Sequence, residues 1–257
     1  VVWVACAGLG AAVPEGWRAT GGAEARALII LPPSEKPAAE AARALGARIN
    51  PPLDVLRPAK TVVLAVKPAM WRDALPPLVP YLNPEAVLLS VMAGVRADDL
   101  FAAAGRPVAR IMPTTAVAQG QGVAAVWSED GRALRAAQAL FAPVADVAPL
   151  EDEGLMDAAT AVAGSAPAFI YAFVQALADA GVAQGLSPEA AARLARGALR
   201  SAGAGLETGE GLDALIARIA SPGGTTRAGL DAMADGGDLK RAAEAAVRAA
   251  VDRARSF

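Results

Sequence analysis

The first half of the chain alternates short, continuous apolar runs with longer segments of helical periodicity. Uninterrupted apolar runs are typical of parallel strands that are covered on both faces. They predict strands over residues 1–6, 27–31, 61–66, 87–92 and 108–112, separated by helices that include residues 35–46, 69–82 and 97–104. Residues 122–127 and 146–150 are expected to extend the sheet around one more helix, residues 131–142. This alternation predicts an α/β fold with a doubly wound parallel sheet.

After residue 151 the periodicity is helical throughout. Ser187 followed by Pro188 provides an N-cap and a proline at the first helical position, which predicts a helix to about Leu206. Residues 212–220 and 239–255 predict two further helices. We therefore expect a domain boundary near Leu150, with an α/β domain over residues 1–150 and an all-α domain over residues 151–257.

Residues 158–178 contain no charged side chain and are numerous enough to span a membrane. Glycine, proline and glutamine interrupt this stretch, and no basic flank marks an orientation. We therefore expect a buried helix pair and no membrane partner. Because one small helical domain supplies too little apolar cover, we also expect a homodimer or a larger assembly built from the helices after Glu151.

The composition excludes several classes of protein. The net charge of −2 argues against a nucleic-acid or anionic-membrane surface. One cysteine allows no internal disulfide, and no basic segment opens the chain, so a cytoplasmic protein without a signal peptide is expected. The absence of histidine removes Ser-His-Asp and Cys-His nucleophile schemes and most transition-metal sites. Chemistry must then use carboxylates, lysine, tyrosine, hydroxyls or a cofactor.

A glycine-rich loop precedes the helix expected over residues 227–234. It reads Ser221-Pro222-Gly223-Gly224-Thr225-Thr226. The two glycines let the backbone approach a ligand closely, and the loop carries amide N–H groups into a helix N-terminus. This arrangement predicts a site for an anion such as a carboxylate, with threonine hydroxyls beside it. The alternative is a tight turn with a threonine cap.

A second candidate loop follows the first strand, where dinucleotide-binding folds have a Gly-x-Gly-x-x-Gly turn. The sequence there is Ala5-Cys6-Ala7-Gly8-Leu9-Gly10, so alanine replaces the first two glycines. Pro14 also falls inside the expected helix, where it removes a hydrogen bond. The position therefore predicts a cofactor site, and the residues predict a weakened one.

Further cofactor candidates lie at the carboxyl ends of other strands, where ligands bind in such folds. Ser34 and Lys36 follow the second strand, and a hydroxyl with a cation suits the 2′-phosphate of NADPH, although the nearby Glu35 leaves NADH open. The remaining candidates at this edge are Asn50, Ala65, Val66, Lys67, Pro68, Met92, Ala93 and Gly94. Lys67 is equally well explained as a solvated lysine at a strand end.

Glu153 and Asp157 are spaced i and i+4 on the first helix after the expected boundary. One helical face would carry both carboxylates toward a cofactor. A solvated acidic turn at a helix N-terminus is an equally ordinary explanation.

Seven segments, taken in order, resemble the pyrroline-5-carboxylate reductase family, whose members catalyse the last step of proline biosynthesis. They are residues 65–68, 90–94, 110–113, 153–158, 164–169, 179–182 and 221–226. The resemblance covers essentially the whole chain. It implies a Rossmann domain followed by an all-α dimerisation domain that interlocks two subunits.

The resemblance also implies roles for individual residues. Ser221, Gly223, Gly224 and Thr225 would bind the substrate carboxylate, and Thr226, the catalytic candidate, would hydrogen-bond the ring nitrogen. Residues 66–68 and Ala93 would border the cofactor, and Glu153 would reach its nicotinamide end. The reaction implied is hydride transfer from NADPH to C5 of Δ1-pyrroline-5-carboxylate, which yields L-proline. Because an iminium carbon is already electrophilic, this step needs no histidine.

The chain departs from the family pattern at several positions. Ala5 and Ala7 replace glycines, the family's Met-Pro-Asn-Thr-Pro reads Met112-Pro113-Thr114-Thr115-Ala116, Ala166 replaces a glycine, and Arg218 stands where a small polar amide is usual. Three alternatives therefore stay open. They are a related imine or β-hydroxyacid-type reductase, a cofactor-weakened paralogue with a binding or regulatory role, and a purely structural helical dimeriser.

Overall fold

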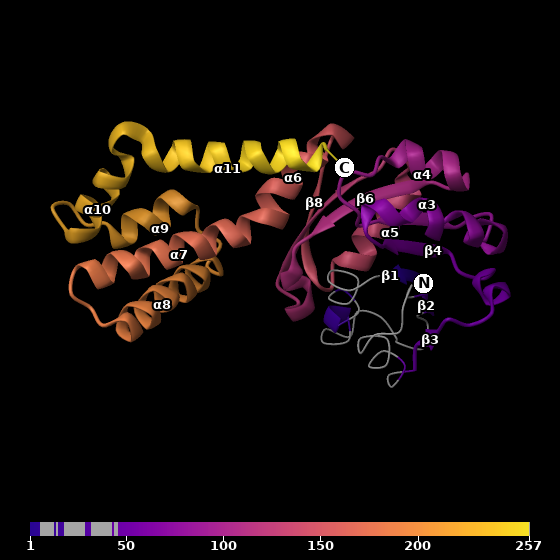
Figure 1. The fold of residues 1–257 in the computed structure, drawn as a ribbon, viewed down its shortest axis with the longest axis horizontal. Coiled ribbons are helices and arrows are strands. Elements are labelled where there is room, and N and C mark those ends of the chain that lie inside the picture. The colour runs from indigo at the N-terminus through magenta and orange to yellow at the C-terminus, as the bar shows by residue number, and fades with distance from the viewer. Residues whose placement is uncertain (6–12, 14, 18–28, 32–42, 44–45, 257) are drawn as a thin grey trace. The chain divides into compact units, whose positions relative to one another are not determined.

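The computed structural model describes residues 1–5, 13, 15–17, 29–31, 43 and 46–256 (Figure 1). They divide into two compact units. The α/β unit comprises Val1–Gly164 with Ala250–Phe257, and the helical unit comprises Ser165–Ala249. We describe each unit separately.

The α/β unit is built on a sheet of strand order β3-β2-β1-β4-β5-β6-β7-β8. The strands are β1 (Val2–Ala5), β2 (Ile29–Leu31), β3 (Arg48–Ile49), β4 (Thr61–Ala65), β5 (Val87–Ser90), β6 (Val108–Pro113), β7 (Gly122–Trp127) and β8 (Ala145–Pro149). The pairs from β3 to β6 are all parallel. The chain runs outward from β1 to β3 and returns to β4 on the other side of β1. This reversal of strand order is the switch point at which such sheets bind ligands.

The last two strands correct the expectation of a fully parallel sheet. β7 runs antiparallel to β6, with Arg110 opposite Trp127, and β8 then pairs parallel with β7. The connection from β6 to β7 holds only the 3₁₀ segment η5 (Thr115–Gln119). A parallel crossover needs a dozen or more residues, so this short connection forces the reversal. β3 was not predicted, because two residues carry no recognisable apolar run.

Apolar side chains of successive strand residues point to opposite faces of the sheet. Trp3 and Val63 belong to one core cluster, which α5 (Gly131–Phe141) covers with Phe141. Val4 and Leu64 belong to the other cluster, which is covered from α4 (Ala97–Ala104) and its neighbouring 3₁₀ segments. Helices on both faces confirm the doubly wound architecture.

The prediction of one continuous helix over residues 69–82 is wrong. The structure has η3 (Pro68–Met70), the single turn α3 (Trp71–Ala74) and the 3₁₀ segment η4 (Pro76–Tyr81). Pro76, Pro77 and Pro80 have no backbone N–H to donate, so a regular α-helix cannot pass through them. One further 3₁₀ segment, η2 (Leu53–Leu56), precedes β4. The helix expected over residues 35–46 lies largely outside the described residues.

The chain after β8 is helical, as expected. The elements are η6 (Glu153–Leu155), α6 (Met156–Ala159), the π-helical η7 (Thr160–Ser165), α7 (Ala166–Ala183), α8 (Pro188–Leu206), α9 (Leu212–Ile219), α10 (Thr225–Ala234), η8 (Asp235–Gly237) and α11 (Asp238–Ala254). The α/β unit continues beyond the predicted boundary near Leu150, because Met156 packs in a cluster with Met112 and Ala125. The end of α11 also belongs to this unit, and Arg255 Nε lies 3.6 Å from Asp157 Oδ2.

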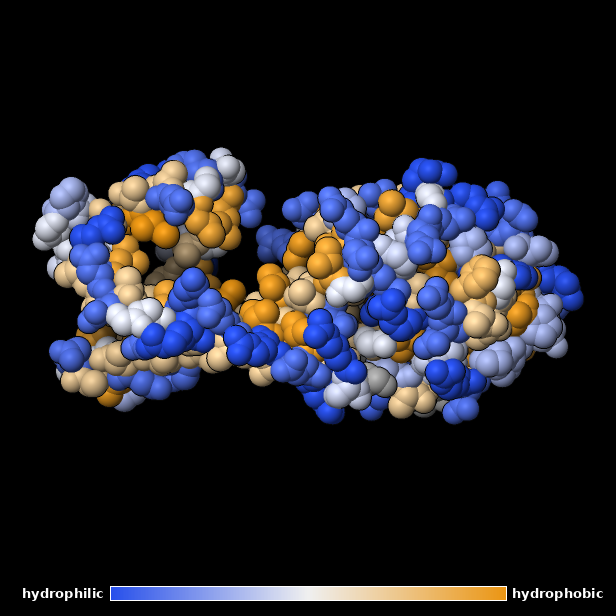
Figure 2. Space-filling model, turned by 90° about the horizontal axis from the view of Figure 1, so that it is seen from above, coloured by the Kyte–Doolittle hydropathy of each residue, from blue (hydrophilic) through white to orange (hydrophobic). Residues whose placement is uncertain are grey.

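The expectation of a buried helix pair is wrong for the single chain. α7 packs on α8 through small residues, Ala178, Ala191 and Ala195. Large apolar side chains of α7 stay exposed, namely Phe169, Ile170, Tyr171, Phe173, Leu177 and Val182. Figure 2 shows apolar residues at the surface of the helical unit. The segment Glu153–Ala183 is long and apolar enough to cross a membrane, a property that it shares with core helices of globular proteins.

Candidate active site

The loop between α9 and α10 has a backbone path that favours glycine at two consecutive positions. Gly223 has a φ of 71°, in the left-handed region, and the Gly224 N–H donates to the Ser221 carbonyl at 3.0 Å. A Cβ at Gly224 would lie 2.6 Å from Ser221 Oγ and 3.2 Å from the Ser221 carbonyl oxygen. The conformation of Gly223 therefore favours glycine, and a side chain at Gly224 would crowd the Ser221 carbonyl oxygen.

This loop leads into α10 and leaves its first turn open. Gly224 is the N-cap and offers no side chain to the helix N-terminus. Thr225 and Thr226 are the first two helical residues, and both are exposed. The N–H groups of a first helical turn have no intrahelical acceptor, and they carry the positive end of the helix dipole. The arrangement can bind a carboxylate and present the hydroxyl groups beside it.

Arg218 stands at the last turn of α9, shortly before the loop. Its Nη1 donates to Glu210 Oε1 at 2.8 Å, and both side chains are exposed. The guanidinium that replaces the family's small amide is thus engaged by a carboxylate of the same unit.

The structure brings the described cofactor candidates to one edge of the sheet. Leu64 of β4 lies opposite Ser90 of β5, so the loops that follow these strands are neighbours. The first loop carries Val66, which is buried, and Lys67, which is exposed and precedes Pro68 of η3. Ala65 pairs with Ala5 of β1, which places the first loop beside the end of β1.

The second loop turns sharply before α4. Met92 is buried, and its N–H donates to Ser90 Oγ at 3.3 Å. Gly94 has a φ of 72°, which a residue with a side chain rarely adopts. Asn50 follows β3 at the same edge, with a φ of 44° and its N–H donating to the Ile30 carbonyl at 3.0 Å.

Seven cofactor candidates lie outside the described residues. They are Cys6, Ala7, Gly8, Leu9, Gly10, Ser34 and Lys36.

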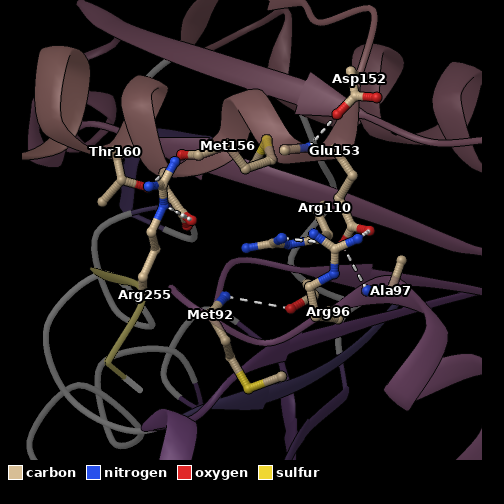
Figure 3. A network of polar contacts seen from close by, with 12 residues as sticks. Met92, Arg96, Ala97, Arg110, Asp152, Glu153, Met156, Thr160 and Arg255 are labelled. Atoms are coloured by element: carbon tan, nitrogen blue, oxygen red, sulfur yellow. Dashed lines mark hydrogen bonds and ion pairs between the residues drawn. The ribbon is translucent and has the colours of Figure 1, made fainter. Parts of the chain in front are cut away.

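Glu153 is buried, and both of its carboxylate oxygens are engaged within the protein (Figure 3). Oε1 accepts from the Ala97 N–H at 2.8 Å and from Arg110 Nη1 at 3.0 Å. Oε2 pairs with Arg96 Nη2 at 3.0 Å. Glu153 is therefore not solvated, and neither of its carboxylate oxygens is without a partner.

Arg96 and Arg110 were missed as site residues by sequence reasoning. Arg110 lies within β6, where all six residues are buried. A charge inside a buried strand demands a partner, and this signal could have identified it. Arg96 carried no comparable signal, because an arginine in a loop is ordinarily solvated.

Thr114, which stands in place of the family's asparagine, closes the connection between β6 and β7. Its Oγ1 accepts from the Val123 N–H at 3.1 Å, and its own N–H donates to the Val123 carbonyl at 2.9 Å. The substituted side chain is thus used within the sheet.

Comparison with known proteins agrees with this geometry. Residues 153–257 match the family described as "Pyrroline-5-carboxylate reductase dimerisation", and residues 5–94 match "NADP oxidoreductase coenzyme F420-dependent". The chain is 37% identical to pyrroline-5-carboxylate reductase of Pisum sativum over 72% of this chain and 69% of that protein. The corresponding enzyme of Pseudomonas aeruginosa is 37% identical over 76% and 73%. The chain belongs to the pyrroline-5-carboxylate reductase family.

Solved structures of the family have the same fold. The Plasmodium falciparum pyrroline carboxylate reductase with NADP bound has a TM-score of 0.80 and 25% identity, over 99% of this chain and 97% of that one. The Streptococcus pyogenes enzyme has a TM-score of 0.78 and 26% identity, over 100% and 98%. The sequence resemblance, the Rossmann-like sheet and the helical dimerisation domain are thereby confirmed. The match to a dimerisation domain also supports a homo-oligomer.

Proposed function

We propose that the protein is an NADPH-dependent reductase that converts Δ1-pyrroline-5-carboxylate to L-proline, the last step of proline biosynthesis. The observation that carries this proposal is the loop from Ser221 to Gly224 at the open N-terminus of α10. In a member of this family, such a loop suits the carboxylate of the substrate. We assign the backbone N–H groups of Gly223 and Thr225 to that carboxylate, with Ser221 and Gly224 forming the turn beside it.

Thr226 is the residue that we assign to the ring nitrogen. Its hydroxyl stands on the first turn of α10, next to the proposed carboxylate site. A hydrogen bond there would fix the orientation of the ring and so present one carbon, C5, for reduction. A substrate that arrives as the protonated imine needs no further proton, because the nitrogen ends the step as a neutral amine.

The edge formed by the ends of β4 and β5 fits a dinucleotide. It adjoins the switch point between β1 and β4, and the second loop turns at Gly94. NADPH supplies the hydride that adds to C5. We assign residues 65–68 and 92–94 to its binding, together with Asn50 and the candidates outside the described residues. The dimerisation domain and the single cysteine favour a homodimer that works in a reducing compartment such as the cytoplasm.

The decisive experiment is NADPH oxidation by the purified protein, with and without pyrroline-5-carboxylate. We expect oxidation that depends on the substrate. Tight NADPH binding without turnover would instead favour a related imine reductase, which a panel of cyclic imines would identify. Absence of both binding and turnover would favour the cofactor-weakened paralogue suggested by Ala5 and Ala7.

A further inference from the structure

Two arginine side chains from separate elements, Arg96 and Arg110, meet at the carboxylate of Glu153. Arg96 is the N-cap of α4, Arg110 lies within β6, and Glu153 is the first residue of η6. Arg110 is 3% exposed and Glu153 is 6% exposed, whereas the Arg96 side chain is 55% exposed. Figure 3 shows Arg96, Arg110 and Ala97 directed at the same carboxylate.

The buried part of this cluster depends on one acceptor. Two guanidinium groups share the single carboxylate of Glu153. Within the described part of the chain, Arg110 Nε has no hydrogen-bond partner, so no second acceptor offsets the loss of Glu153. Burial of an ion pair costs desolvation free energy, and an apolar pair of similar volume is often as stable. The buried ion pair would be explained if it were needed to hold a neighbouring part of the chain in position.

The position that Glu153 fixes is that of the loop between β5 and α4. At the start of this loop, the Met92 N–H is bound by Ser90 Oγ. At its end, Glu153 binds the Ala97 N–H and the Arg96 guanidinium. Glu153 thereby also supplies the anion at the α4 N-terminus, because the Arg96 side chain makes no capping hydrogen bond.

A second contact to the same loop comes from the same segment. Ala93 packs against the cluster formed by Met112, Ala125 and Met156. Glu153 therefore holds the loop by an ionic contact, and the cluster that contains Met156 holds it by an apolar one. Met92, Ala93 and Gly94 are the residues that we assign to the cofactor.

We propose that Glu153 is a positioning residue for NADPH, which it never touches: through Arg96 and Ala97 it holds the loop of Met92, Ala93 and Gly94 in its binding position. This inference rests on the cofactor site of the proposed function. It predicts that loss of the Glu153 charge weakens NADPH and leaves the substrate loop before α10 unaffected.

The test compares wild type with Glu153→Gln and Arg96→Gln. Glutamine keeps the shape of Glu153 and an oxygen for the Ala97 N–H, but it loses the charge. Arg96→Gln leaves the buried pair of Arg110 and Glu153 intact, so it reports on the loop even where Glu153→Gln fails to fold. Glu85→Gln is the matched control, because Glu85 forms an exposed pair with Arg132 at 3.1 Å.

We expect Glu153→Gln to raise the Kd and the KM for NADPH by about tenfold, and Arg96→Gln to raise them less. The KM for pyrroline-5-carboxylate should stay unchanged, and Glu85→Gln should match wild type. Kd is measured by calorimetric titration with NADPH alone, at a temperature where circular dichroism shows folded protein.

Equal NADPH affinity in wild type, Arg96→Gln and any folded Glu153→Gln would overturn the inference. An equal rise in both KM values would overturn it as well, because it would indicate a general structural defect. Wild-type protein that binds NADPH without reducing the imine would refute the proposed substrate alone, and the NADPH titrations would still decide the role of Glu153. Wild-type protein that binds no NADPH would overturn this inference directly.

Discussion

Arg110 and Glu153 form a buried ion pair across 43 residues of chain, with Arg110 Nη1 at 3.0 Å from Glu153 Oε1. Arg110→Met removes this pair but leaves Glu153 paired with Arg96 and accepting from the Ala97 N–H. We therefore expect Arg110→Met to lower the free energy of unfolding by about 1.5–3 kcal/mol, the range for a hydrogen bond to a charged group. Urea unfolding at one fixed protomer concentration measures this loss.

Arg132→Met is the control for Arg110→Met, because Arg132 forms its pair with Glu85 on the surface. It should cost less than about 1 kcal/mol. Equal losses from the two substitutions would contradict the argument from burial.

Local patterns were sufficient for most strands and helices. β7 was predicted with its exact ends, and α8 was predicted from the cap at Ser187 and Pro188 to Leu206. The direction of β7 was missed, because it depends on the length of the connection and leaves no trace in the apolar run itself. The proline-rich segment after α3 was read as a helix from its apolar spacing, although its prolines forbid one.

The candidate site was predictable where it depends on neighbours in the chain. The turn at Gly223 and Gly224 is a local conformation, so a sequence motif describes it fully. The environment of Glu153 depends on Ala97 and Arg110, which are 56 and 43 residues away in the chain. The i, i+4 spacing with Asp157 could not reveal these partners.

Thr226→Val should lower kcat/KM for pyrroline-5-carboxylate with little loss of stability, because Thr226 is exposed on α10. Loss of a hydrogen bond to the ring nitrogen costs about 1–3 kcal/mol, or about tenfold to a hundredfold in rate. Thr208→Val is the control, since Thr208 Oγ1 donates to the Gly205 carbonyl away from the loop. Steady-state kinetics identical for the two variants would remove Thr226 from the assigned role.

Phe173→Glu should dissociate the homo-oligomer. Phe173 is 48% exposed in the single chain, among the other large apolar side chains of α7. A carboxylate buried there against a second subunit would lack a partner. Light scattering at micromolar concentrations should give a smaller mass than wild type. Phe101→Glu is the control, because Phe101 of α4 is 56% exposed outside the dimerisation domain; dissociation by both variants would show that α7 is not the specific interface.

Asp130→Ala should destabilise the protein by about 1 kcal/mol at neutral pH. Asp130 is the N-cap of α5, and its Oδ1 accepts from the N–H groups of Ala133 at 3.0 Å and Arg132 at 2.7 Å. The hydrogen bond from the Ala133 N–H is the main cause that lowers the pKa of Asp130, with the Arg132 N–H and guanidinium adding to it.

The sign of the pH dependence follows from that lowered pKa. The contribution of Asp130 is present above the pKa of the unfolded carboxyl and is lost as the pH falls through the folded pKa. The difference between wild type and Asp130→Ala should therefore narrow below about pH 4. Asp130→Asn keeps the capping oxygen without a titrating group, so its stability relative to Asp130→Ala should not change with pH. Denaturant unfolding at several pH values measures these differences in the free energy of unfolding. A difference between wild type and Asp130→Ala that stays constant with pH would exclude the lowered pKa.

The altered glycine turn leads to a prediction about the affinity for NADPH. In dinucleotide-binding turns, the first glycine permits a tight turn and the second lets the backbone approach the pyrophosphate. The sequence has Ala5 and Ala7 at these positions. A Cβ at the second position obstructs that approach, and alanine at the first must turn within ordinary φ and ψ limits.

Obstruction or strain of this kind costs about 1–3 kcal/mol, or about tenfold to a hundredfold in affinity. We therefore expect weak NADPH binding by wild type and tighter binding by the double variant Ala5→Gly, Ala7→Gly. Calorimetric titration of both proteins in one buffer measures the difference, and the two single variants separate the turn from the approach. Equal affinities would mean that the backbone reaches the pyrophosphate by another path. If neither protein binds NADPH, the cause would lie at Pro14 or Arg218. That result would favour a protein that has lost catalytic activity.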